Sequence, residues 1–214
     1  DHNIFATTSV DRTCCLWDVR MLRKGAGPGG KETVLQPLLS QSYGGAVTGA
    51  TFSRNGQRLV VTSQNNMVSV YNVSISHAVS DAAGVSLLGG QQPGWDENCL
   101  QIDHPHRFYQ HLTQHRATFH PRSNDLFIIG RFPEKDAVGL DAQKGLDVYC
   151  TRSGRFVARL GLEWPGIQAG AAAIRADGEA VASMSGHTVL VYSRGDHCQS
   201  DQGFGGAASG GGGG

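Results

Sequence analysis

The chain has 214 residues, with 18 basic and 18 acidic side chains and a formal net charge of zero. This length is enough for one or two domains with a substantial buried core. The neutral balance excludes a general charge attraction to nucleic acid, so a DNA contact would need a local basic patch. Apolar runs fall short of the ~18 residues of a membrane span, and we expect neither a signal peptide nor a membrane partner.

Four strand-and-turn units follow one another along the chain. Residues 4–20 are typical of a strand, a tight turn containing Asp11 and a second strand that ends at Trp17-Asp18. The second unit spans 47–73, and its Asn55-Gly56 pair is a strong hairpin signal between alternating β-branched residues. Strand-like runs in the third unit cover 117–121, 125–131, 145–149 and 155–160, and those in the fourth cover 171–175, 180–184 and 188–193.

An aromatic residue recurs near the end of a strand in every unit, at Trp17, Tyr71, Tyr149 and Tyr192. The last two lie 43 residues apart, which matches the ~40–45-residue period of WD40 repeats. The repeats predict an all-β WD40 β-propeller over 1–195, consisting of the C-terminal blades of a seven-bladed ring, about three full repeats plus part of one more. We expect an insertion at 77–113 and a disordered, glycine-rich tail at 196–214.

Positive charge is concentrated between His104 and Arg131, where five histidines and four arginines face a single acid. Within it, residues 104–113 (HPHRFYQHLT) combine an arginine, imidazoles, an amide and two aromatic rings. This mixture suits a hairpin that inserts a flat side chain into a base stack while cations hold phosphate. Alternatively, Phe108 and Leu112 are core residues of an irregular strand. Successive side chains of a strand alternate in direction, however, so some of this run must be exposed.

These residues, with His120-Pro121-Arg122 and the loop Gly130-Arg131-Phe132-Pro133, resemble the C-terminal part of a known family. This is the damage-specific DNA-binding protein 2 family, the small WD40 subunit of the UV-damaged-DNA-binding complex. The resemblance covers most of the chain, from the strand at 5–11 to the segment at 182–191.

The resemblance implies roles for several residues. Tyr109, Gln110 and His111 match a triplet that wedges into the minor groove while the damaged dinucleotide flips out, although the family has Phe where Tyr109 stands. Arg107 matches a phosphate-contacting arginine, and Arg131 and Lys144 are further candidates for phosphate contact.

A second motif is Trp17-Asp18-Val19-Arg20. Trp and Asp at this place are structural in most WD repeats, whereas an arginine two positions after the Asp is typical of WD40 receptors of cullin-4 ubiquitin ligases. We therefore expect Trp17, Asp18 and Arg20 to bind the ligase adaptor, the large subunit of the damage-binding complex.

Metal, cofactor and catalytic sites are not predicted. The five cysteines lack a CxxC pair, which indicates reduced thiols rather than disulfides or a zinc knuckle. The spacings of His104, His106, His111, His115 and His120 do not predict a closed tetrahedral metal site. No nucleophile elbow, phosphate-binding loop or acid–base pair is present, so we expect neither an enzyme nor a cofactor.

The sequence thus predicts a nuclear protein that recognises UV-damaged double-stranded DNA in nucleotide excision repair. It would also act as the WD40 substrate receptor of a cullin-4 E3 ubiquitin ligase, with histones as an additional candidate partner. The alternative is a WD40 chromatin- or protein-binding scaffold without lesion specificity, for which an Arg-aromatic-Gln-His tip would not be needed.

Overall fold

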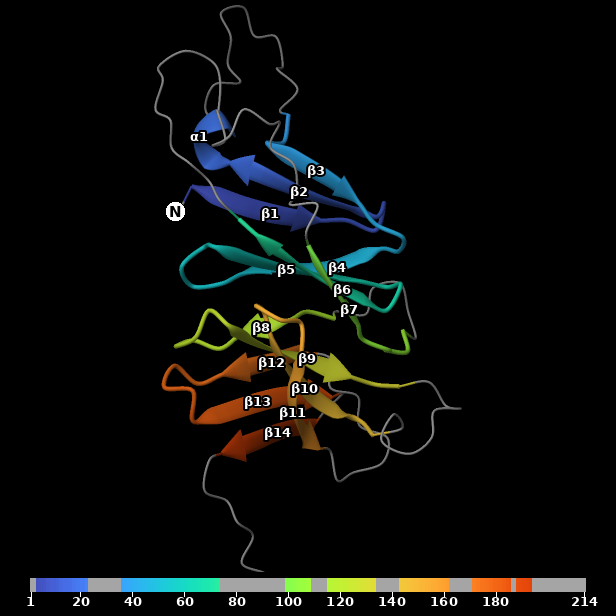
Figure 1. Cartoon of the computed structure of the whole chain (residues 1–214), viewed down its shortest axis with the longest axis vertical. Coiled ribbons are helices and arrows are strands. Elements are labelled where there is room, and N and C mark those ends of the chain that lie inside the picture. The colour runs from blue at the N-terminus through green and yellow to red at the C-terminus, as the bar shows by residue number, and fades with distance from the viewer. Residues whose placement is uncertain are drawn as a thin grey trace, which may run out of the picture.

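The chain is built almost entirely of β-strands over the residues that the computed structural model describes, which are 3–22, 36–73, 99–108, 115–133, 143–161, 171–185 and 188–193 (Figure 1). The strands form four antiparallel sheets in chain order. In Figure 1 the sheets follow one another along the long axis, with β1–β3 at one end and β12–β14 at the other.

The first sheet has the order β1-β2-β3, and a single helical turn, α1 (Val19–Leu22), follows β2. Its strands are Ile4–Thr8, Thr13–Asp18 and Leu39–Ser42. The second sheet, β4-β5-β6-β7, consists of Val47–Phe52, Arg58–Ser63, Met67–Asn72 and Leu100–Asp103. The third, β8 to β11 in spatial order, consists of Thr118–Phe119, Leu126–Arg131, Gly145–Cys150 and Phe156–Gly161. The fourth, β12-β13-β14, consists of Ala171–Ile174, Ala180–Ser185 and Thr188–Ser193.

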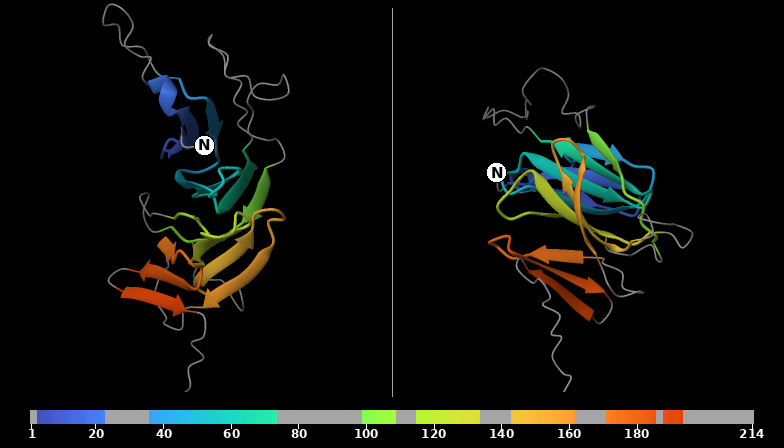
Figure 2. Two further views of the ribbon diagram at one scale, coloured as in Figure 1. Left: turned by 90° about the vertical axis from the view of Figure 1, so that its left-hand side faces the viewer. Right: turned by 60° about the horizontal axis from the view of Figure 1, so that its bottom comes forward.

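Neighbouring sheets meet along their first strands. Strand β1 contacts β4, β4 contacts β8, and β8 contacts β12. Figure 2 shows the same succession from two further sides, with the strands of the last sheet turned relative to those of the third. Two of the sheets have four strands and two have three, and antiparallel sheets of this size that touch through their inner strands are the blades of a β-propeller. The strands expected in the four units are present, so the predicted fold class is confirmed.

Two of the turns form where the sequence predicts them, because each has a glycine at a position with positive φ. Gly56 has φ 72° and Gly178 has φ 80°, a region that side-chain-bearing residues rarely adopt. At the first turn the Ser53 amide donates to the Arg58 carbonyl oxygen at 2.9 Å, which closes the β4–β5 hairpin.

The core lies between the sheets, and strand β5 shows why. Val60 belongs to the apolar cluster shared with the third sheet, whereas its neighbours Leu59 and Val61 belong to the cluster shared with the first sheet. Alternate side chains of one strand therefore fill two different interfaces. A central strand covered on both faces is apolar at almost every position, which explains the continuous run Leu59-Val60-Val61.

The outermost strands β3 and β7 were not expected from the sequence. Their sequences, LSQS and LQID, are short and polar, as is common for edge strands. Strand β7 pairs with β6 from Val70↔Leu100 to Met67↔Asp103. It lies inside the segment predicted as an insertion at 77–113, so that prediction is wrong for residues 100–103. The rest of the segment before 99 and the tail at 196–214 lie outside the described residues.

Apolar side chains remain exposed at the end of the molecule formed by the last strands. These residues are Phe156, Val157, Met184, Val189 and Val191. Within the described ranges, no helix is long and apolar enough to cross a membrane.

Candidate nucleic-acid interface

The base of the predicted DNA hairpin is held by hydrogen bonds on two sides. The His104 amide donates to the Asn66 carbonyl oxygen at 2.8 Å, and the His106 amide donates to the Asn66 side-chain oxygen at 3.2 Å. On the other side, the Arg107 amide donates to the Phe132 carbonyl oxygen at 2.6 Å. Residues 104–107 are thereby fixed between the β5–β6 turn and the end of β9. The tip residues Tyr109, Gln110 and His111 lie outside the described residues, so their predicted wedge role stays a prediction.

Two predicted phosphate contacts meet at Phe132. The Lys144 ammonium lies 4.6 Å from the centre of the Phe132 ring, a cation–π distance, and the Arg107 backbone binds the Phe132 carbonyl. Both cations are partly exposed. A third cation, Arg116, follows residues 109–114 in the chain and is exposed. The described residues flanking the hairpin therefore present positive charge on both sides, although the whole protein is neutral.

Arg131 does not share this surface. Its side chain is about 5% exposed, and its Nη1 lies 3.8 Å from the carboxylate of Asp147. Asp147 is fully buried and also accepts from Arg159, with 2.6 Å between Arg159 Nε and Oδ1 and 3.1 Å between Nη2 and Oδ2. Burying a guanidinium requires a charged partner, which here is Asp147. The burial of Arg131 does not favour the phosphate contact expected from sequence, and we leave this residue out of the proposed DNA-contact set.

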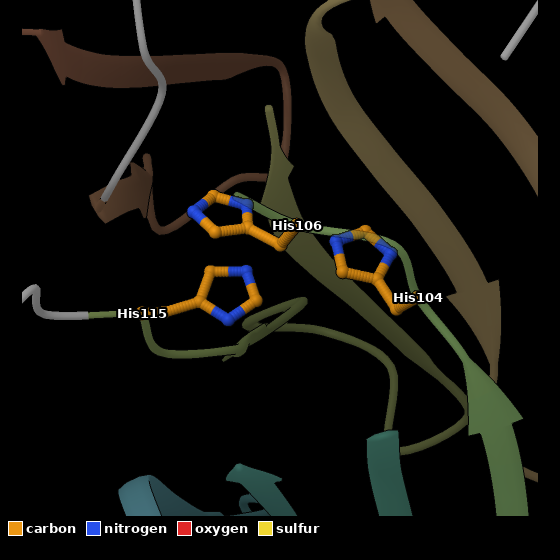
Figure 3. Close-up of side chains that lie close together, drawn as sticks. All are labelled: His104, His106 and His115. Carbon is orange, nitrogen blue, oxygen red and sulfur yellow. The ribbon is translucent and has the colours of Figure 1, made fainter. Parts of the chain in front are cut away.

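Three histidines converge beside this ion-pair network. One ring nitrogen from each of His104, His106 and His115 lies within 4.8 Å of the corresponding nitrogens of the other two, and all three residues are buried. Figure 3 shows one nitrogen of each ring facing the space between the rings. The spacings did not predict that these three residues lie together. They converge because the segments before and after residues 109–114 both return to strand β9.

The Gly130 carbonyl oxygen of β9 lies among the rings. It accepts from His104 Nε2 at 2.8 Å and from His115 Nε2 at 2.9 Å. The other nitrogen of His104, Nδ1, lies 3.2 Å from the Tyr149 hydroxyl. Among the described residues, Nδ1 of His115 has no hydrogen-bond partner. The rings of His106 and His115 stack with centroids 3.9 Å apart.

Burial keeps these imidazoles neutral. Desolvation lowers the pKa of His104 to about 3, of His106 to about 2 and of His115 to about 4, because the charged form loses its hydration inside the protein. For His104 and His106, the positive charge of a protonated His115 and the nearby Arg131 lower the pKa further. At neutral pH each ring is therefore uncharged and has one nitrogen without a proton, and that of His106, Nδ1, accepts from the Phe132 amide at 3.2 Å.

The Trp17-Asp18-Val19-Arg20 motif forms a compact unit at the end of β2. Trp17 Nε1 donates to Thr7 Oγ1 at 2.8 Å, and the ring stacks on Phe5 with centroids 6.4 Å apart. The Asp18 carboxylate is buried and accepts from the Arg20 amide at 2.8 Å and from its guanidinium Nη2 at 2.5 Å. The Arg20 side chain is 49% exposed. Trp17 and Asp18 are therefore structural, and they hold Arg20 in a fixed orientation at the surface.

Known proteins similar to this chain include WD-repeat proteins and DNA damage-binding proteins. The family "WD domain, G-beta repeat" matches residues 1–18 and 36–72. DNA damage-binding protein 2 of Mus musculus is 31% identical over 195 residues, covering 89% of this chain and 38% of the relative. The protein of the same name from Bos taurus is 31% identical over 193 residues, with the same coverage. The chain thus spans well under half the length of these relatives.

Among solved structures, the β-propeller domain of Cps50 (Swd1) from Myceliophteria thermophila superposes with a TM-score of 0.54. The match covers 90% of this chain and 48% of that domain, at 13% identity, and it therefore supports the fold alone. The repeat match, the sheets and this superposition define the chain as a WD40 β-propeller protein. Within that class it is similar to DNA damage-binding protein 2, at 31% identity over 89% of this chain.

Sequence reasoning missed the buried residues beneath the interface. Asp147 was seen only as part of a strand and Tyr149 as a recurring aromatic residue, and the spacings of His104, His106 and His115 did not predict that they lie together. The HPH pattern with a third histidine nine residues later was the available signal. It could not be interpreted without knowing that both segments pack against Gly130.

Proposed function

We propose that this protein recognises UV-damaged double-stranded DNA without chemical conversion of it. The observation that carries the proposal is the similarity to DNA damage-binding protein 2 over 89% of the chain. That similarity includes the segment in which the arginine, aromatic and imidazole residues of the predicted hairpin stand. A nuclear location and a role in nucleotide excision repair are parts of the same proposal.

The described residues support a division of labour at this surface. Arg107 and Lys144, both beside Phe132, supply sequence-independent attraction to the phosphate backbone, which Arg116 strengthens from the other flank. The anchored base at residues 104–107 gives the tip a rigid support, so that insertion into DNA does not require ordering of the whole segment.

In the proposed mechanism, Tyr109, Gln110 and His111 enter the minor groove and occupy the gap left by an extruded lesion. Selectivity arises because a photodimer is already partly unstacked. Its extrusion therefore costs less than the few kcal/mol needed to flip an intact, stacked pair.

The test replaces Tyr109, Gln110 and His111 together by Ala and compares lesion-bearing with undamaged duplexes at one fixed salt concentration. Stacking of one aromatic side chain on a base contributes about 1–3 kcal/mol, so the preference for damaged DNA should fall by about ten- to a hundredfold. Affinity for undamaged DNA should change little, because the phosphate contacts remain.

Tyr109→Phe is the matched control and should leave the preference unchanged, since the ring does the stacking. A triple variant that keeps the full discrimination ratio would favour the alternative, a WD40 scaffold that binds chromatin or protein without lesion specificity.

The second part of the proposal is that the protein is a substrate receptor of a cullin-4 ligase, docked through Arg20 on the large adaptor subunit. The supporting observation is the exposed guanidinium that Asp18 orients. Histones on damaged chromatin are then candidate partners. Arg20→Glu should sharply reduce co-purification of the adaptor, while binding to damaged DNA should be unchanged.

Arg175→Glu is the control, because Arg175 pairs with Asp177 two residues away at 2.8 Å and is also exposed. It should retain the adaptor. Equal adaptor recovery with both variants would contradict the docking role of Arg20.

A further inference from the structure

We propose that His104, His106 and His115 form a binding site for a transition-metal ion, Zn²⁺ in the first place, which joins the two sides of the predicted hairpin. Each residue offers a ring nitrogen within 4.8 Å of the others, and all three are buried. The ligands come from two segments, one before and one after residues 109–114. The metal site itself does not depend on the proposed function.

The ligand chemistry selects the class of ion. Three imidazoles suit zinc, copper, nickel or cobalt and do not suit the hard ions magnesium and calcium, which prefer oxygen. Zinc with three histidine ligands and one further ligand is a common tetrahedral arrangement. The Gly130 carbonyl oxygen is the candidate fourth ligand, since it lies 2.8 Å from His104 Nε2 and 2.9 Å from His115 Nε2.

Closing the site requires the three nitrogens to move closer together. Zinc–ligand bonds of about 2.0–2.1 Å imply ligand–ligand separations of roughly 3.4 Å for a tetrahedron. The nitrogen–oxygen distances already fall below this value, and the nitrogen–nitrogen distances of up to 4.8 Å exceed it by little more than 1 Å. The rings of His106 and His115 stack with centroids 3.9 Å apart, so they must also turn out of this stack to direct their nitrogens at one ion.

The protonation states also permit binding. His104 and His115 now carry the proton on Nε2, where it is donated to Gly130, and binding would move that proton to Nδ1 of the same ring. For His104, Nδ1 then faces the Tyr149 hydroxyl at 3.2 Å and the Asp147 carboxylate at 3.8 Å. This is the second layer of hydrogen bonds that orients metal-binding histidines in many proteins. Because the rings are already neutral, no proton has to be expelled from them, but at His106 binding replaces the hydrogen bond that Nδ1 accepts from the Phe132 amide at 3.2 Å.

The neighbouring charges limit the affinity. Arg131 and Arg159 both lie against Asp147, so two positive charges and one negative charge stand close to the site. Their net repulsion predicts weaker binding than at an all-thiolate structural zinc site. It does not abolish binding, since Asp147 faces both guanidiniums.

An ion at this site would connect His106 with His115, which precede and follow residues 109–114 in the chain. Any effect on DNA rests on the proposed function above, whereas the binding of metal can be measured without DNA.

The experiment titrates the chelator-treated full chain with Zn²⁺ by calorimetry and with Co²⁺ by visible absorption. We expect one ion per chain and the d–d absorption of tetrahedral Co²⁺. His115→Leu should weaken binding by more than about 100-fold, because loss of even a supporting partner of a ligand costs about 10–100-fold. His106→Gln should do the same. His120→Gln should bind as the wild type does, because His120 lies outside the cluster.

Because His115→Leu could fail to fold, circular dichroism of each variant accompanies the titrations, and the wild-type stoichiometry is a test in its own right. Absence of saturable one-to-one binding in the wild type would overturn the proposal. Equal affinity in a folded His115→Leu or His106→Gln variant would also overturn it. If metal binds but the preference for damaged DNA is the same with and without it, the site stands and its link to the hairpin fails.

Discussion

Replacing Asp147 by Asn probes the buried ion-pair network directly. The Asp147 carboxylate is fully buried and binds the Arg159 guanidinium through two contacts, of 2.6 and 3.1 Å, while Arg131 lies 3.8 Å away. Asn is nearly the same size, so the change removes charge without creating a cavity. Two poorly hydrated guanidiniums then lose the negative charge of Asp147.

Loss of one partner of a buried ion pair destabilises a protein by about 3–5 kcal/mol. A change of 1 kcal/mol shifts Tm by about 2–4 °C in chains of this size, so Asp147→Asn should lower Tm by roughly 6–20 °C. Thermal unfolding followed by circular dichroism, with urea titration as a second measure, gives both quantities.

Asp125→Asn is the matched control. Asp125 also binds an arginine, with 2.8 Å between its Oδ1 and Arg152 Nε, but the two side chains are 39% and 69% exposed. Exposed pairs contribute about 0–1 kcal/mol, so this variant should unfold close to the wild type. If the two Asp→Asn variants are equally stable, the reasoning from burial is refuted.

Two further predictions concern the same region. In metal-free protein, stability should fall as the pH decreases from about 6.5 to about 4, because the unfolded chain then binds protons that the folded His115, whose pKa is about 4, does not. Each such histidine contributes about 1.4 kcal/mol per pH unit to the free energy of unfolding. The urea midpoint of His115→Leu should therefore change less with pH than that of the wild type. An equal slope in the two proteins would contradict the buried neutral state of His115. Gly145→Ala should destabilise by about 1–3 kcal/mol, since a Cβ there overlaps the Leu160 carbonyl oxygen. Its cross-strand partner Gly161 faces open space. The free energy of unfolding of Gly161→Ala should therefore stay within about 0.5 kcal/mol of the wild-type value in the same urea titration. Equal losses in the two variants would contradict the predicted overlap.

Much of the fold could be predicted from the sequence because its signals are local. Alternating β-branched residues, the turn glycines Gly56 and Gly178 and the recurring aromatic residues depend on neighbours a few positions away. Strands β3 and β7 were missed for the same reason. Their polar sequences form strands because β2 and β6 offer unpaired backbone groups beside them, which no local pattern records.

The site was only partly accessible from the sequence. The Asp18–Arg20 pair is a local motif, and its geometry follows from a separation of two residues. The burial of Arg131 depends on the tertiary structure, because its partner Asp147 lies on a different strand, β10. The same is true of the proximity of His104, His106 and His115, since two segments separated in the chain pack against the carbonyl of Gly130. Charge and burial are decided by such long-range neighbours, and a run of cationic residues therefore did not reveal which side chains face solvent and which face one another.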